Sequence, residues 1–124
     1  MRIFVIKEFS KWAKASDVTD DLLRKAVDEI ERGLVDADLG SHLLKKRIAT
    51  KGRGKSGSIR TLLTFSKGHR TIFMYGFEKS ERDNITQKER KLLQELGNFY
   101  LSLTDIELEL RLADKALREL RKEQ

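Results

Sequence analysis

The chain has 124 residues, with 26 Lys and Arg against 20 Asp and Glu, and therefore a formal net charge of +6. This length suits one domain spanning residues 1–124 and is too short for two independent cores. The chain has no Cys, which excludes disulfides, a thiol nucleophile and Cys-ligated metals, and its two histidines, His42 and His69, argue against a zinc site.

The N-terminal half predicts one strand and two helices. Residues 2–6 are apolar and β-branched, which is typical of a strand. This apolar run is too short for a signal peptide or a membrane span, so we expect a cytoplasmic protein. A short helix follows around Trp12, and Asp17 or Thr19 can cap a second helix. Its apolar stripe consists of Leu22, Leu23, Ala26, Val27 and Ile30.

The central part of the chain predicts three strands, over residues 43–49, 58–66 and 69–77. A Gly-rich basic loop, residues 50–57, separates the first two strands, and the turn Lys67-Gly68 joins the last two in a hairpin. The loop lacks the spacing of a phosphate-binding P-loop and precedes a strand, not a helix, which excludes a P-loop NTPase.

Two capping boxes open the C-terminal helices: Thr86 with Glu89, and Thr104 with Glu107. The second box starts a helical extension over about 104–124, whose apolar seam either packs on the protein's own sheet or binds a partner or second copy. The apolar residues of that seam are Ile106, Leu110, Ala113, Leu117 and Leu120. The predicted fold class is α+β, with a small antiparallel sheet packed against helices.

The positive charge is confined to one segment. Residues 1–40 carry a net of −2 and residues 80–124 a net of −1, whereas residues 41–79 hold ten basic side chains and one acidic one, a net of +9. This segregation favours a surface that binds a polyanion, with nucleic acid as the first candidate. The alternative is a solvated basic surface that only keeps the protein in solution.

The hairpin suggests a site. If Lys67 and Gly68 alone form the turn, Arg60 lies opposite Tyr75, beside the basic loop. An Arg fork can hold phosphate oxygens while a Tyr ring stacks on a base. Equally, Arg60 can cover the Tyr75 ring and pair with a carboxylate.

Two segments resemble RelE-like toxins of bacterial toxin–antitoxin pairs, most closely the HigB-like branch of the RelE/ParE superfamily. They are Lys-Gly-Arg-Gly-Lys-Ser-Gly-Ser-Ile-Arg (51–60) and Tyr-Gly-Phe-Glu-Lys-Ser-Glu-Arg-Asp-Asn-Ile (75–85). The resemblance covers roughly residues 40–100 and implies a RelE-like fold. It also implies a ribosome-dependent endoribonuclease that cleaves mRNA without metal or cofactor and is neutralised by an antitoxin, expected to be a helix-turn-helix protein. ParE-like members inhibit DNA gyrase instead, and a general RNA-binding module is a further alternative.

The resemblance assigns roles by position. Arg60 matches the arginine that contacts the scissile phosphate, and Lys79 and Arg82 match basic positions after the last strand. Tyr75 or His69 stands in for a family tyrosine that is absent at Thr86, and Ser80 replaces a family arginine. The expected catalytic residues are Arg60, Lys79, Arg82 and Tyr75. The expected RNA-binding residues are Lys51, Arg53, Lys55, Arg70 and His69.

Overall fold

The computed structural model describes residues 1–50 and 58–120 and has the predicted α+β class. The elements run in the order β1 (Arg2–Ile6), α1 (Lys7–Ala15), α2 (Asp20–Glu31), β2 (Ala37–Asp38), β3 (Leu43–Ala49), β4 (Ser58–Ser66), β5 (Arg70–Glu78), α3 (Gln87–Ser102), α4 (Asp105–Ala113) and β6 (Leu117–Glu119). The predicted bounds of β1, β3 and β4 are confirmed.

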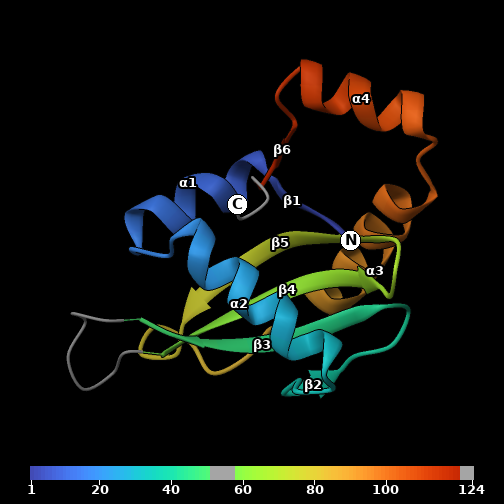
Figure 1. Cartoon of the computed structure of the whole chain (residues 1–124). Helices are drawn as coiled ribbons and strands as arrows, with labels where there is room; N and C mark the ends of the chain where they lie inside the picture. The colour runs from blue at the N-terminus through green and yellow to red at the C-terminus, as the bar shows by residue number, and fades with distance from the viewer. Residues whose placement is uncertain (51–57, 121–124) are drawn as a thin grey trace.

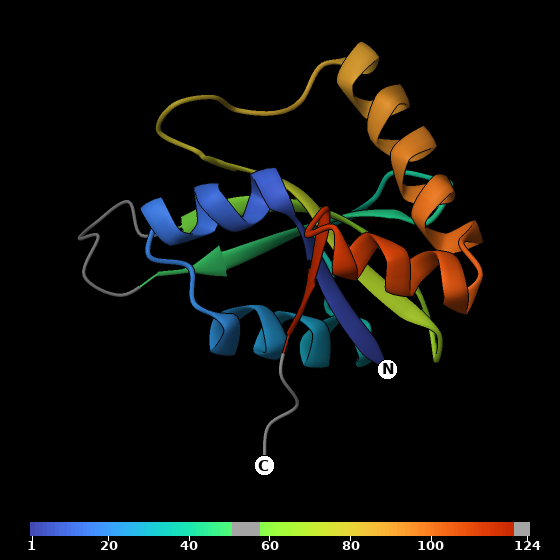
Figure 2. The same ribbon diagram turned by 90° about the horizontal axis from the view of Figure 1, so that it is seen from above.

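The strands form one six-stranded sheet in the order β2-β3-β4-β5-β1-β6. Figure 2 shows the sheet between α2 on one side and α3 on the other, and α3 also lies behind the sheet in Figure 1. All strand pairs are antiparallel, as expected, except β1 with β5, which run parallel. A long connection separates these two strands in the chain, so β5 can enter in the same direction as β1.

The two faces of the sheet bury apolar side chains under the helices. Phe9 of α1 packs on Phe73 of β5, with ring centroids 5.5 Å apart. Trp12 lies directly against Gly76, where a Cβ atom would come within 2.1 Å of its ring. On α2, the predicted stripe is buried at Leu23, Ala26, Val27 and Ile30, and the Thr19 side chain caps the helix by accepting the Leu22 N–H.

The predicted C-terminal helix is wrong beyond Ala113. The helix α4 ends there, and residues 117–119 form β6, antiparallel to β1. Leu117 and Leu120 are therefore buried from a strand, whereas Ile106 and Leu110 of α4 are 77% and 60% exposed. Three- and four-residue spacing fits the helix up to Ala113, but pairing with the free edge of β1 determines the conformation of the chain after it.

The predicted hairpin register is also wrong. Ser66 pairs with Arg70, so the turn holds three residues, and a β-bulge shifts the register between Leu62 and Leu63. Arg60 consequently lies opposite Phe77 and not opposite Tyr75. A three-residue turn is one of the common hairpin connections, and it displaces every pair by one position. The bulge displaces the pairs beyond it, including that of Arg60, by a second position.

Candidate functional site

A bulge in β5 turns Tyr75 toward the face on which α3 lies. Leu63 pairs with Phe73 but Leu62 pairs with Tyr75, so Met74 is an extra residue. A bulge changes the alternation of side chains along a strand. The Met74 side chain accordingly lies near Gly97 of α3, whereas two residues further on the Cα of Gly76 faces Trp12 of α1. Tyr75 therefore projects on the α3 side.

Arg60 lies on the same face, at the end of the sheet that α3 leaves open. It is opposite Arg47 of β3 on one side and Phe77 of β5 on the other. Tyr75 is its diagonal neighbour, at about 7–8 Å in ordinary sheet geometry. Arg60 is half-buried, and its Nη1 donates to the Ser58 Oγ at 3.1 Å.

The Arg60 guanidinium has no carboxylate partner within residues 1–50 and 58–120. The exposed side chain of Arg47, directly across the strand pair, adds a second cation at the same level. Like charges placed opposite each other repel, and an anion bound between them removes that repulsion. This corner of the sheet is thus suited to a phosphate group.

Arg82 is the centre of a polar network beside Tyr75. Its Nη1 donates to the Tyr75 Oη at 3.1 Å and to the Glu89 Oε2 at 3.0 Å, and its Nη2 donates to the Glu89 Oε1 at 2.6 Å. Its Nε donates to the Asn84 carbonyl at 3.0 Å, and its Cζ lies 5.5 Å from the centroid of the Phe77 ring. The guanidinium thus makes four hydrogen bonds within the protein, although its side chain remains 30% exposed.

The Arg82–Glu89 ion pair shifts the pKa of both groups. The hydrogen bond to Arg82, with further bonds to Thr86, lowers the pKa of the Glu89 carboxyl to about 2. The hydrogen bond to Glu89 raises the pKa of Arg82 above its ordinary value. Both groups stay charged at neutral pH and their charges cancel locally, so Arg82 adds little to the positive field to which Arg60 and Arg47 contribute.

Lys79 lies at the same end of the sheet as Arg60. It is exposed and directly follows Glu78, which pairs with Ile59, the neighbour of Arg60. The loop from residue 79 to 86 then runs on the α3 side of the sheet (Figure 2). Lys51, Arg53 and Lys55 lie outside the described residues, in the segment that joins Thr50 to Ser58.

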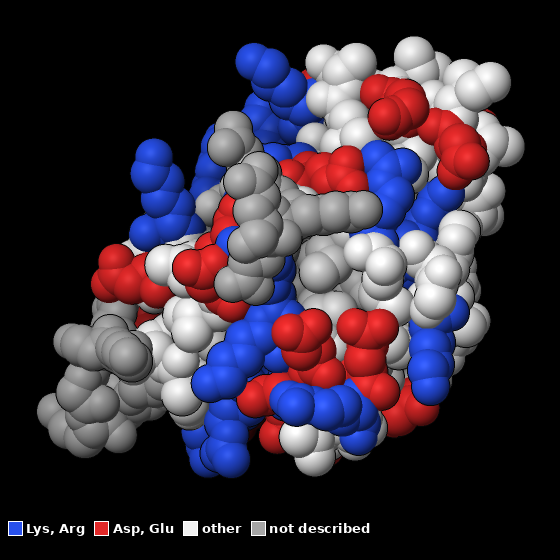
Figure 3. Space-filling view, in the orientation of Figure 1, with Lys and Arg blue, Asp and Glu red and all other residues white. Residues whose placement is uncertain are grey.

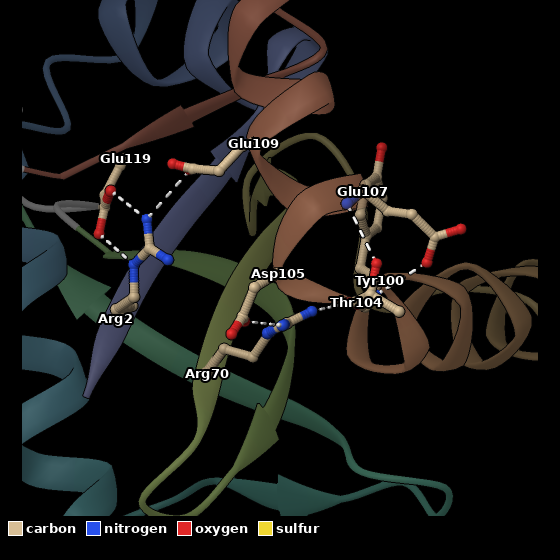
Figure 4. A network of polar contacts seen from close by, with 8 residues as sticks. All are labelled: Arg2, Arg70, Tyr100, Thr104, Asp105, Glu107, Glu109 and Glu119. Carbon is tan, nitrogen blue, oxygen red and sulfur yellow. Dashed lines mark hydrogen bonds and ion pairs between the residues drawn. The ribbon is translucent and has the colours of Figure 1, made fainter.

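His69 and Arg70 lie at the opposite end of the hairpin. Six residues of strand separate Arg60 from Ser66, which is about 20 Å. His69 is exposed in the turn, but Arg70 is only 3% exposed and its guanidinium donates to the Tyr100 carbonyl at 2.8 Å and to Asp105 at 3.5 Å (Figure 4). The expectation that Arg70 binds RNA is therefore corrected: this arginine ties β5 to the junction of α3 and α4.

Another basic side chain of the central segment is also used internally. Lys46 is buried, and its Nζ donates to the Leu34 carbonyl at 2.8 Å and pairs with Glu29 of α2 at 2.9 Å. On the face that α2 covers, Lys and Arg are interspersed with Asp and Glu (Figure 3). By strand alternation, Lys45, Arg47 and Arg60 project on the other face.

Sequence reasoning missed two residues of this site. Arg47 could have been found by pairing residues 43–49 with residues 58–66, which places it opposite Arg60. Glu89 was recognised only as a helix cap, and no signal in the sequence links it to Arg82. Within the described residues no group of acidic or His side chains is placed to hold a metal ion, and no helix is long and apolar enough to cross a membrane.

Comparison with known proteins gives one family. The model of the RelE toxin of the RelE/RelB toxin–antitoxin system matches residues 1–120. No curated protein matches the chain.

Proposed function

We propose that this chain, which belongs to the RelE toxin family, is a toxin that cleaves mRNA on the ribosome. The match over residues 1–120 supports a toxin of a toxin–antitoxin pair, and the open corner of the sheet supports RNA as its target. The chain is further proposed to belong to the HigB-like branch and to act in the cytoplasm with a helix-turn-helix antitoxin.

One observation carries the proposal: Arg60 has no carboxylate partner within the described residues and lies opposite Arg47, one diagonal step from Tyr75. A planar guanidinium matches phosphate oxygens, and a phenol ring beside it can stack on an unpaired base. This combination suits single-stranded RNA better than a duplex, whose bases are already stacked.

The proposed reaction uses the RNA itself as nucleophile. The 2′-oxygen of one nucleotide forms a bond to the adjacent phosphorus and loses its proton, while the bond from phosphorus to the 5′-oxygen breaks and that oxygen takes up a proton. The products are a 2′,3′-cyclic phosphate and a free 5′-hydroxyl. Arg60, with Arg47 beside it, stabilises the charge that develops on the phosphate oxygens.

The other residues have supporting roles in the proposal. Lys79 adds a cation near the same phosphate, and Lys51, Arg53 and Lys55 supply further cations from the Gly-rich segment. Tyr75 stacks on a base or donates its hydroxyl hydrogen, since its oxygen already accepts from Arg82. His69 lies about 20 Å away and can only contact a more distant part of the RNA or ribosome.

In vitro translation followed by primer extension tests this function. The proposal predicts cuts in mRNA at codons in the ribosomal A site with wild-type protein, and no cuts with Arg60→Ala. Intact mRNA together with inhibited DNA supercoiling would instead assign the chain to the gyrase-directed toxins. Binding of RNA without cleavage or translational arrest would identify an RNA-binding module.

A further inference from the structure

We propose that Glu89 is a positioning residue of the cleavage site: it holds Arg82 against Tyr75 and keeps Arg82 away from the RNA phosphate. This assignment rests on the proposed function, because it gives Arg60 the contact with the phosphate and gives Arg82 the positioning of Tyr75. The sequence pattern around Glu89 predicts only a helix cap.

The Glu89 carboxylate makes contacts beyond those that a helix cap requires. Its Oε1 accepts the Thr86 N–H at 2.8 Å, and the Thr86 hydroxyl accepts the Glu89 N–H at 3.1 Å, which completes the capping box of α3. Both of its oxygens also accept from Arg82, at 2.6 and 3.0 Å. Glu89 therefore fixes Arg82 to the first turn of a helix.

The second capping box provides an internal comparison. Glu107 accepts the Thr104 N–H at 2.8 Å and donates its own N–H to the Thr104 hydroxyl at 3.1 Å, the same arrangement as in the first box. Neither Glu107 oxygen accepts a hydrogen bond from an Arg of the described residues. A glutamate can therefore cap a helix of this fold without pairing with a guanidinium, and the pair of Glu89 with Arg82 is not needed for the cap.

Because Glu89 fixes the Arg82 guanidinium, Arg82 in turn restricts the orientation of Tyr75. Its Nη1 is shared between Glu89 and the Tyr75 oxygen, and its plane lies near the Phe77 ring, which itself lies 6.1 Å from the Tyr75 ring. The phenol oxygen is held as an acceptor, so its own hydrogen points elsewhere. The geometry thereby sets both the ring plane and the direction in which Tyr75 can donate.

The Arg82–Glu89 ion pair also leaves Arg60, and not Arg82, to bind the phosphate. A guanidinium bound by two carboxylate oxygens has little attraction left for an anion, whereas within residues 1–50 and 58–120 Arg60 has only the Ser58 hydroxyl as a side-chain partner. Without Glu89, Arg82 would be free to compete with Arg60 for the phosphate and to leave Tyr75. Substrate binding would then survive, but in the wrong geometry.

The test compares Glu89→Gln with Glu107→Gln. An amide oxygen can still accept at a capping box, so both variants keep their caps and lose one carboxylate charge. We expect the single-turnover rate of mRNA cleavage on programmed ribosomes to fall by about 10- to 100-fold in Glu89→Gln, with ribosome affinity unchanged or tighter. Glu107→Gln should cleave at the wild-type rate.

A second measurement does not depend on cleavage. The chain has two tyrosines, so ¹³Cζ-labelled tyrosine gives two NMR signals, which Tyr75→Phe assigns. The Tyr75 signal should shift in Glu89→Gln and stay in place in Glu107→Gln. An unshifted Tyr75 signal in Glu89→Gln would overturn the role of Glu89, and so would equal losses of cleavage rate in Glu89→Gln and Glu107→Gln. Wild-type protein that does not cleave at all would overturn the proposed function instead.

Discussion

Gly97 of α3 packs directly on Thr64 of β4: a Cβ atom on Gly97 would lie 2.8 Å from the Thr64 Cβ. This close approach seats α3 over the part of the hairpin nearest its turn. The helix does not reach the other end of the same face, where Arg60 and Arg47 lie opposite each other (Figure 2). The position of one helix thus leaves that end of the sheet to the loop 79–86 and the proposed site.

Gly97→Ala should destabilise the protein. Alanine favours a helix over glycine by about 1 kcal/mol, but forcing a methyl group into this contact costs about 1–3 kcal/mol, and we expect the steric cost to prevail. Urea unfolding measures the difference. Asn98→Ala, at the exposed neighbouring position of α3, is the control and should be neutral or slightly stabilising. A Gly97→Ala variant more stable than wild type would show that α3 is not seated as described.

Arg70→Ala should reduce stability and leave RNA binding intact. The substitution removes the guanidinium that donates to the Tyr100 carbonyl, and we expect the free energy of unfolding to fall by about 2 kcal/mol. Thermal or chemical unfolding measures this loss. Lys67→Ala, in the exposed turn, serves as the control. Folded Arg70→Ala protein that bound ribosomes clearly more weakly than Lys67→Ala protein would show that Arg70 contacts RNA after all.

The Arg82–Glu89 pair predicts a specific loss of stability in acid. The pKa of the Glu89 carboxyl is about 2 in the fold, below its ordinary 4.5, so the folded state binds this proton less readily than the unfolded state. The pair's stabilisation is complete above about pH 4.5 and disappears as the pH falls through 2. The difference in the free energy of unfolding between wild type and Glu89→Gln should therefore be clearly smaller at pH 2.5 than at pH 5. A constant difference would contradict the lowered pKa.

Binding to ribosomes or RNA should weaken steeply with salt, because bound phosphates release counterions. On single-stranded RNA, Arg60→Ala and Arg47→Ala should each reduce the slope of log K against log salt by about 0.7. Lys25→Ala, on the helix that covers the opposite face, should not change it. Equal slopes in all four proteins would show that the corner of the sheet is not the binding surface.

Local sequence signals predicted most of the elements. Apolar runs delimited β1, β3 and β4, and the Thr-x-x-Glu pattern located the starts of α3 and α4, since each of these features depends on neighbouring residues only. The class of the fold followed from the order of the elements.

Long-range geometry was not predictable in the same way. The bulge at Leu62/Leu63 depends on how both strands pack, and it alone brings Tyr75 to the face where Arg60 lies. Residues 117–119 have helical spacing, yet they pair with β1, a strand more than 100 residues away. The partnership of Arg82 with Glu89 likewise arises only when the loop after β5 returns to the first turn of α3.

The most direct test uses purified ribosomes programmed with two mRNAs that differ by one atom, the 2′-oxygen of the nucleotide before the cut. We expect wild-type protein to cleave the all-ribose mRNA to a 2′,3′-cyclic phosphate and to leave the 2′-deoxy mRNA intact, and we expect Arg60→Ala to abolish this cleavage. Cleavage of the 2′-deoxy mRNA, or undiminished cleavage by Arg60→Ala, would contradict the proposed reaction.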